Sequence, residues 1–281
     1  MITLRDLVAA YLTEQLTILV DAPARIRAGE DVTHKTRVAL RRLRSTLRTF
    51  PELFDIPKAG RLEEELRWWA GLLGAVRDLD VQSERLGAAL DAVPDELAMG
   101  PLRRQLAEFV AVRRGPALQA LRETLDSPRY RTLDALLHAW RVDPPFTEAA
   151  DQPGKKAARY VKRADRKTHR RLAEATQAYR QGEPDADDLL HRARKAGKRH
   201  RYAVELAAPV LGKKADAIVT ERKEFQQLLG EHQDSVVAEG LLRELGVLAS
   251  TEGENGFTWG LLYAREQEAA RAAVAKLRRY L

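Results

Sequence analysis

The chain contains no cysteine among its 281 residues, which excludes disulfides and thiolate metal ligands. It also lacks any uninterrupted apolar run approaching the roughly 20 residues that span a bilayer. Charged residues at Arg5, Asp6 and Glu14 make the N-terminus unlike a secretory signal. The alternation of β-branched residues that marks strands is missing as well. These absences lead us to expect a soluble, cytoplasmic protein without strands or membrane contacts.

What the chain does contain is helical periodicity nearly throughout. Apolar residues such as Leu4, Leu7, Val8 and Leu12 recur at helix spacing, and proline and glycine mark the interruptions. The first helix is expected to end before Ala22-Pro23, and Asp31 is expected to cap the second. The predicted helices cover about 3–22, 31–50, 58–90, a segment after Pro101, 127–140, 155–171, 188–208 and 257–281.

Acidic residues are missing from two basic segments that share one pattern. Counting from a histidine, basic residues fall at +1, +3, +7, +8 and +10 in both, and no Asp or Glu lies between Asp31 and Glu52 or between Asp188 and Glu205. In the first segment the charges share one helical face opposite Leu40, Leu43 and Leu47. Without counter-charges at i±4, both faces are expected to bind an external anion. Their basic residues are Lys35, Arg37, Arg41, Arg42, Arg44 and, in the second copy, Arg192, Arg194, Lys198, Arg199 and Arg201.

A second repeated element follows each basic segment. Gly74 lies 40 residues after His34, Gly230 lies 39 residues after His191, and each glycine precedes an aspartate, Asp78 or Asp234, by four positions. Two motifs in register indicate an internal duplication. We therefore expect halves at 1–141 and 155–281 joined by a linker at 142–154. A third basic stripe at the start of the second half comprises Lys155, Arg159, Lys162, Arg163, Arg166 and Arg170.

These motifs resemble those of the CHAD domains, a family of histidine-containing α-helical domains. The similarity comprises His-x-x-Arg-Val-x-x-Arg-Arg-Leu-Arg at 34–44, Leu-Gly-x-x-Arg-Asp-Leu-Asp-Val at 73–81, and related patterns at 191–202 and 225–234. The resemblance implies two pseudo-symmetric four-helix bundles around a basic channel or groove that binds inorganic polyphosphate without catalysis. It also implies a stand-alone form, because the CYTH domain that often accompanies such domains is absent from this sequence. Partners would then include polyphosphate-metabolising enzymes or granule proteins.

Candidate site residues follow from the basic faces and the resemblance together. Arginine suits phosphate because its planar fork binds two oxygens at once. A histidine within such a face is expected to donate a hydrogen bond to phosphate or to hold a neighbouring side chain, and no closely spaced ligand set favours a metal or another cofactor. We expect polyphosphate to contact His34, Lys35, Arg37, Arg41, Arg42, Arg44, Arg48, Lys155, Arg159, Lys162, Arg163, Arg166, His191, Arg194, Lys198, Arg199, Arg201 and Tyr202, supported by Arg77, Asp78 and Asp234.

Other interpretations remain open at this stage. Asp78, Asp80 and Asp234 could serve a metal-dependent phosphohydrolase, although helix capping or pairing with an arginine of the basic helix is the stronger interpretation. Nucleic acid would also suit a basic surface, but neither histidine segment has an Asn or Gln for base readout. A scaffold at granule surfaces is the third alternative. His200 falls opposite the charged arc and is expected to be a packed structural residue, and the four tryptophans are expected in the core.

Overall fold

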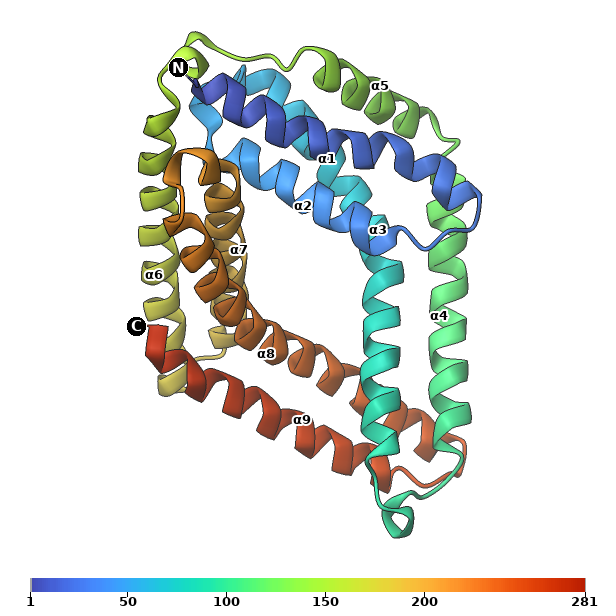
Figure 1. Cartoon of the computed structure of the whole chain (residues 1–281). Coiled ribbons are helices and arrows are strands. Elements are labelled where there is room, and N and C mark those ends of the chain that lie inside the picture. Colours follow the sequence, from blue (N-terminus) through green and yellow to red (C-terminus); the bar gives the residue numbers. More distant parts are fainter. Residues whose placement is uncertain (1, 281) are drawn as a thin grey trace. The chain divides into compact units, whose positions relative to one another are not determined.

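The computed structural model describes residues 2–280, and no β-strand is present within this range. Its all-α class matches the expectation from the sequence. The α-helices, labelled in Figure 1, are α1 (Leu4–Arg27), α2 (Thr33–Thr49), α3 (Ile56–Asp91), α4 (Leu102–Thr124), α5 (Pro128–Val142), α6 (Ala157–Gln181), α7 (Ala186–Leu211), α8 (Lys214–Thr251) and α9 (Phe257–Lys276). Short 3-10 helices lie at Pro51–Leu53 (η1), Asp95–Leu97 (η2), Glu148–Asp151 (η3), Gly154–Lys156 (η4) and Leu277–Tyr280 (η5).

Contacts between Cα atoms divide the chain into two compact units. Unit 1 contains the described chain up to Gly74 together with Gln119–Arg170 and Lys195–Glu224. Unit 2 contains Ala75–Leu118, Arg171–Arg194 and the described chain from Phe225 onward. Each unit therefore draws on segments from both predicted halves. The boundary at 142–154 expected from the duplication does not separate the compact units, and the duplication itself stays a prediction.

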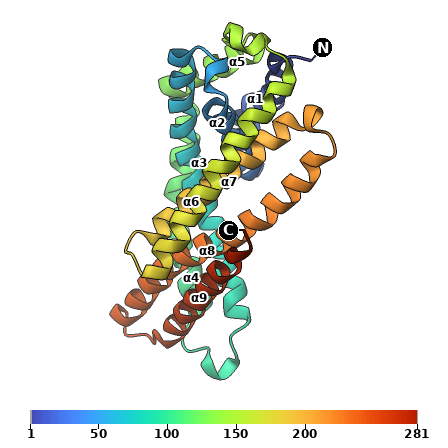
Figure 2. The same ribbon diagram turned by 90° about the vertical axis from the view of Figure 1, so that its left-hand side faces the viewer.

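Unit 1 is organised around α1, which packs against α2 and α5. Figure 1 shows α1 running alongside α2, and the turned view in Figure 2 agrees. Helix α1 begins with a capping box, in which Thr3 and Asp6 each bind the other's backbone N–H. Its apolar stripe is fully buried and includes Leu4, Leu12 and Leu16. This packing holds the apolar face of α2 inward, so the basic face of α2 is turned away from α1.

Unit 2 contains two apolar clusters. The first joins Leu86 and Leu90 of α3 to residues of α4, α8 and α9, with Trp259 fully buried among them. The second is formed where α6 and α7 meet the start of the unit 2 part of α8, and Phe225 packs edge-on against Tyr280 with ring centroids 5.3 Å apart. Three tryptophans, Trp69, Trp140 and Trp259, are buried as expected. Trp68 is only half-buried.

Prolines are poor markers of helix ends in this chain. Helix α1 was expected to end before Pro23 and α7 at Pro209, yet both helices continue past these residues, to Arg27 and Leu211. A proline inside a helix removes one hydrogen bond. Pro23 is itself buried beside Ile26, so apolar packing offsets that loss in α1. The cap of α2 also differs: Val32 holds the N-cap position, and Asp31 accepts instead from the Thr33 hydroxyl at 2.7 Å.

The segment predicted as a linker packs within unit 1. The Leu4 N–H donates to the Gln152 carbonyl at 2.9 Å, and the Thr147 N–H donates to the Leu53 carbonyl at the same distance. Gly154 is buried so tightly that a Cβ there would lie 3.0 Å from the Ile2 carbonyl oxygen. Residues 142–154 are therefore an integral part of unit 1, because their backbone groups are paired with its N-terminus and with the segment after α2.

Candidate functional site

Helix α2 carries the first basic motif on its outward side. Leu40, Leu43 and Leu47 are buried, whereas His34 and Lys35 are exposed, as helical phase predicts. Arg37, Arg41, Arg42 and Arg44 are half-buried, and Arg48 is exposed. The guanidinium groups thus emerge from an apolar base, which keeps their charge at the protein surface.

Several arginines of this motif have internal counter-ions that the sequence did not reveal. Arg44 and Arg48 both donate to Glu63 of α3, the former at 3.3 Å. Burial of Glu63 acts to raise its pKa, but Arg48 and Arg44 hold that pKa below its ordinary value. Arg42 donates from Nε to Glu205 of α7 at 3.1 Å. The expectation that an external anion alone neutralises this face is therefore wrong for these three residues, because tertiary packing brings carboxylates from other helices.

Arg41 differs from these neighbours. Its Nε is buried and has no hydrogen-bond acceptor within residues 2–280, and no ion pair to a described carboxylate involves it. Arg44 Nε is buried without an acceptor as well, so the lack of a carboxylate partner is what separates Arg41 from Arg44. Arg41 is therefore the residue of the first motif whose surroundings most favour an external anion.

The N-terminal part of α6 supplies the third basic stripe. Arg163, Arg166, Lys167 and Arg170 are all exposed on this helix. Lys155 lies just before it in η4 and is exposed, as is Lys162. Spacing of three or four residues places these side chains along one side of the helix. The stripe predicted from the sequence is therefore presented to solvent, with Lys167 as a member that the prediction omitted.

A basic cleft of about 580 Å³ lies in unit 1, where the end of α2, the start of α6 and part of α7 meet. No carboxylate is present among the described residues that line it. Arg48 comes from α2 and Arg199 from α7, so two predicted motifs and the third stripe meet in one cleft. Its lining comprises Arg48, Thr49, Pro51, Tyr160, Arg163, Ala164, Arg166, Lys167, Arg170, Ala196 and Arg199.

The second basic motif is divided between the units. Lys198, Arg199 and Arg201 belong to unit 1, and His191 and Arg194 belong to unit 2. Within unit 1, Arg201 lies 3.5 Å from Glu205. Lys198 and Arg199 are half-buried, and Arg199 enters the lining of the cleft. The second motif therefore reaches the cleft through Arg199, whereas Arg201 has a carboxylate on its own helix.

Tyr202 does not reach solvent. Its side chain is 2 % exposed, and the guanidinium carbons of Arg42 and Arg201 lie 5.8 and 4.9 Å from its ring centroid. These distances permit cation–π attraction. The Tyr202 ring thus lies against the guanidinium groups of Arg42 and Arg201, and its direct contact with a ligand stays a prediction.

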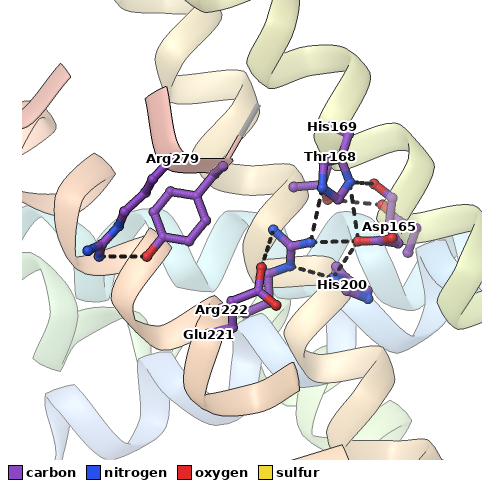
Figure 3. Close-up of polar contacts among 9 residues, drawn as sticks. Asp165, Thr168, His169, His200, Glu221, Arg222 and Arg279 are labelled. Carbon is purple, nitrogen blue, oxygen red and sulfur yellow. Dashed lines mark hydrogen bonds and ion pairs between the residues drawn. The ribbon is translucent and has the colours of Figure 1, made fainter. Parts of the chain in front are cut away.

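A buried polar network in unit 1 connects α6 and α7, two helices that line the cleft (Figure 3). Arg222 of α8 is 3 % exposed, donates from Nε to His200 Nδ1 at 3.0 Å and donates from Nη2 to Asp165 at 2.7 Å. Asp165 precedes Arg166 on α6, and His200 follows Arg199 on α7. Arg222 therefore ties together the two helices that supply most of the cleft cations. His200 is the packed structural residue expected from the sequence.

The donation from Arg222 requires an unprotonated Nδ1 on His200. Burial lowers the pKa of His200 to about 4, with Arg222 and His169 acting in the same direction and Asp165 opposing them. Neutral His200 can accept from Arg222, whereas the protonated ring cannot. The network is consequently complete at neutral pH.

The residues expected to support the site, Arg77, Asp78 and Asp234, lie in unit 2 and do not share one ion pair. Arg194 Nη2 lies 3.9 Å from Asp234, and a Cβ on Gly230 would lie 3.5 Å from the same guanidinium. Arg77 pairs with Glu84 at 3.5 Å. Asp78 is exposed. The pairing of an aspartate with an arginine of the basic helix, one of the interpretations open from the sequence, is thus present for Asp234.

Neither metal-site geometry nor a membrane-spanning helix is found within residues 2–280. No group of three or more His, Asp or Glu side chains there has the arrangement of a metal site. No helix in this range combines the length and apolarity needed to cross a membrane.

The sequence matches a known family model and two curated relatives. The family model described as "CHAD domain" matches residues 10–243. The chain belongs to the CHAD domain family. Two relatives from Mycobacterium tuberculosis, described as "Uncharacterized protein MT2285" (strain CDC 1551 / Oshkosh) and "Uncharacterized protein Rv2226" (strain ATCC 25618 / H37Rv), are each 34% identical over 270 residues, which is 94% of this chain. The chain spans about half the length of these curated relatives, 50% in each case.

Solved structures agree with this assignment. The CHAD domain from the plant Ricinus communis has 28% sequence identity and a TM-score of 0.66, with 97% of this chain and 92% of that chain covered. PptA from Streptomyces chartreusis has a TM-score of 0.80 over 99% of both chains, and its 21% identity makes it a likeness of fold. The all-α architecture is therefore shared with CHAD proteins over nearly the full length.

The CHAD motifs did not identify every residue that shapes the cleft. Arg222 lies outside all the basic stripes, and Glu63 and Glu52 lie outside the motifs. Their partners are distant in sequence or on other helices, so spacing carries no sign of them. Lys167 could have been found, since it follows Arg163 by four residues on one helix.

Proposed function

We propose that this protein binds inorganic polyphosphate through the basic cleft of unit 1 and the adjoining face of α2, without catalysing a reaction on it. The observation that carries this proposal is the set of six cationic side chains lining one cleft, with no described lining residue carrying a carboxylate. Five of the six are arginines, whose forked guanidinium groups suit phosphate oxygens. A linear chain of phosphates offers the repeated charge that such a surface can neutralise.

The burial of the nearby tyrosines favours polyphosphate over nucleic acid as the ligand. Tyr160 and Tyr202, the tyrosines nearest these cations, are each 2 % exposed. Proteins that hold single-stranded nucleic acid usually stack bases on exposed aromatic side chains. Neither tyrosine can serve as such a platform, so the cleft suits a ligand made of phosphate groups and no bases.

The carboxylates near the cleft support a binding role over catalysis. Glu63 is engaged by Arg44 and Arg48, and Glu205 by Arg42 and Arg201. A general base works best when its pKa lies near the operating pH; burial acts to raise the pKa of Glu63, but Arg48 and Arg44 hold it below its ordinary value. We therefore expect incubation with polyphosphate and Mg²⁺ or Mn²⁺ to release no phosphate and to leave chain length unchanged. Chain shortening in that assay would favour the phosphohydrolase alternative.

A charge-reversal experiment tests the proposal. The double variant Arg166→Glu, Arg170→Glu should lower the affinity for long-chain polyphosphate by roughly 100-fold or more in a filter-binding or calorimetric titration. The matched control is Lys213→Glu, Lys214→Glu, which makes the same change in net charge at exposed residues of unit 1 outside the cleft lining. Equal losses in both variants would mean that net charge, and not the cleft, governs binding.

Binding of this kind gives a cellular expectation as well. A chain that holds polyphosphate would accumulate on polyphosphate granules and meet the enzymes that make or degrade the polymer. A fluorescent fusion should co-localise with stained granules, and the Arg166→Glu, Arg170→Glu variant should remain diffuse. Granule association that survives this double substitution would point to a protein contact instead.

A further inference from the structure

Glu52 reaches the cation-rich edge of the cleft from η1, the short helix that follows α2. Its Oε2 accepts from the Tyr160 hydroxyl at 2.9 Å and from Arg159 Nη2 at 3.2 Å, and its Oε1 accepts from Arg163 Nη1 at 3.3 Å. Tyr160 and Arg163 line the cleft, and so does Pro51 beside it. A carboxylate of the protein thus occupies donors that face the proposed ligand.

The two arginines have a second support that does not involve Glu52. Their guanidinium carbons each lie 5.1 Å from the ring centroid of Tyr160. That ring is fixed in turn by Phe50, whose centroid is 4.8 Å away. Cation–π attraction to a buried ring therefore holds Arg159 and Arg163 near their positions whether or not the carboxylate is present.

We propose that Glu52 is an internal counter-anion of the basic cleft, which an incoming phosphate chain displaces from Arg159 and Arg163, so that this one carboxylate limits the affinity of the site. The inference rests on the proposed function. If Glu52 instead positioned the arginines for the ligand, its removal would weaken polyphosphate binding. Displacement predicts the opposite, that removal of Glu52 strengthens binding.

Exposure and chemistry both favour displacement. The Glu52 side chain is 47% exposed, and those of Arg159 and Arg163 are 59% and 52% exposed, so these ion pairs are of the weak surface kind. Hydrogen bonds from Tyr160, then from Arg163, keep the pKa of Glu52 below its ordinary value, so the carboxylate is charged when phosphate arrives. Phosphate oxygens accept bidentately from arginine and can take over both guanidinium groups.

Glu63 provides the contrast within the same unit. Its side chain is 25% exposed, and its partner Arg44 is 20% exposed. Breaking that more buried pair would leave a poorly solvated charge behind, which is costly. We therefore assign the displaceable role to Glu52 alone and a fixed structural role to Glu63.

Salt dependence distinguishes displacement from a general effect of charge. When a cationic site neutralises phosphates of a polyanion, the counterions condensed on the polyanion are released, and the number of phosphates neutralised sets the slope of log affinity against log salt. In the wild-type chain Glu52 cancels one positive charge of the site. Without it, the site can neutralise one more phosphate, so the slope becomes steeper by about one unit.

The test compares Glu52→Gln with Glu65→Gln in the full chain. The amide oxygen introduced by Glu52→Gln can still accept from Tyr160, which keeps the fold intact. Glu65 forms the matched control: it accepts from Arg129 Nε at 2.8 Å, and Arg129 lies 4.2 Å from the ring centroid of Trp68, an equivalent Glu–Arg–aromatic group outside the cleft lining. Titrations use tripolyphosphate and long-chain polyphosphate at several salt concentrations.

We expect Glu52→Gln to bind both probes more tightly by roughly three- to tenfold, as when two exposed ion pairs no longer need to be broken. The gain should be equal for the two probes, because the same carboxylate is displaced by each. The salt slope should steepen by about one unit, and Glu65→Gln should change affinity less than twofold with no change of slope.

Weaker binding by Glu52→Gln would overturn the inference and make Glu52 a positioning residue. So would an unchanged affinity and slope, or an equal gain in Glu65→Gln. Each of these results leaves the proposed function standing as long as the wild-type chain binds polyphosphate. Failure of the wild-type chain to bind either probe would instead refute the proposed function.

Discussion

Arg42 on α2 donates from Nε to the carboxylate of Glu205 on α7 at 3.1 Å. Glu205 also accepts from the Tyr11 hydroxyl at 3.2 Å and lies 3.5 Å from Arg201. Burial, reinforced by Glu205, raises the pKa of Tyr11, so its hydroxyl remains a donor at all ordinary pH values. One carboxylate thus pairs with an arginine from each basic motif, and its hydrogen bond from Arg42 gives Arg42 a structural role despite its place in the motif.

This arrangement predicts different behaviour for two adjacent arginines. Arg42→Met should lower the free energy of unfolding by about 1–3 kcal/mol, since Glu205 loses a hydrogen bond from a charged donor. Its affinity for polyphosphate should stay within about twofold of wild type. Arg41→Met should do the reverse, weakening polyphosphate binding without lowering stability, because the buried Nε that it removes has no hydrogen-bond acceptor within residues 2–280. Urea unfolding and calorimetric titration measure the two effects, and a large loss of binding in Arg42→Met would contradict the assignment.

The His200–Arg222 pair predicts acid sensitivity of the fold. Burial lowers the pKa of His200 to about 4, below the 6.5 of an exposed histidine. Between these pH values the unfolded chain binds a proton at this position and the folded chain does not, so acidification favours unfolding. The stability contributed should be complete above pH 6.5 and should fall by up to about 3 kcal/mol as the pH approaches 4.

Thermal or urea unfolding of wild type and His200→Asn from pH 7.5 to 4 would measure this effect. The asparagine amide can accept from Arg222 near the position of Nδ1 and does not titrate. Wild type should therefore lose stability faster than the variant over this range. Parallel curves would show that His200 is not the titrating group.

Charge reversal at Arg41 and Lys198 tests the face outside the cleft lining. The double variant Arg41→Glu, Lys198→Glu should abolish binding of long-chain polyphosphate, because four units of charge change where the chain would pass. Helicity measured by circular dichroism should match wild type. Unchanged affinity would remove both residues from the binding surface and leave the cleft as the whole site.

The electrostatic character of the site sets its dependence on salt. The five cleft cations other than Arg48, which is paired with Glu63, would each neutralise a phosphate and imply, by analogy with nucleic acids, an affinity that falls roughly 500-fold between 50 and 200 mM salt. A competition titration with labelled tripolyphosphate adds specificity. Unlabelled polyphosphate should displace it far better than the same charge concentration of single-stranded DNA or polyglutamate. Equal competition by all three would favour a general polyanion scaffold.

Much of the secondary structure could be predicted from the sequence. Helical spacing of leucines placed α2 and α5 within a few residues of their observed bounds, and Ser127 caps α5 as the Ser-Pro pair predicts. The errors concentrate where local rules compete with packing. Helices α1 and α7 continue past Pro23 and Pro209, because tertiary contacts outweighed the local preference for a break.

The candidate site was predictable only in part. Exposure of Arg163 and Arg166 on one side of α6 follows from the period of the helix. Burial of Tyr202 does not, since its neighbours in sequence are strongly charged. Nor does the role of Arg222, which is defined by two partners, Asp165 and His200, on two other helices.

The sequence by itself determined the helices, the family and the side of each helix on which cations stand, because these depend on residues a few positions apart. Only the tertiary structure decided which cations keep their charge available. Arg42, Arg44 and Arg48 acquired carboxylate partners from distant segments, while Arg166 and Arg170 were brought into one cleft with Arg199. Ion pairing depends on distances of a few ångströms between side chains of different helices, and these distances are set only when the helices pack.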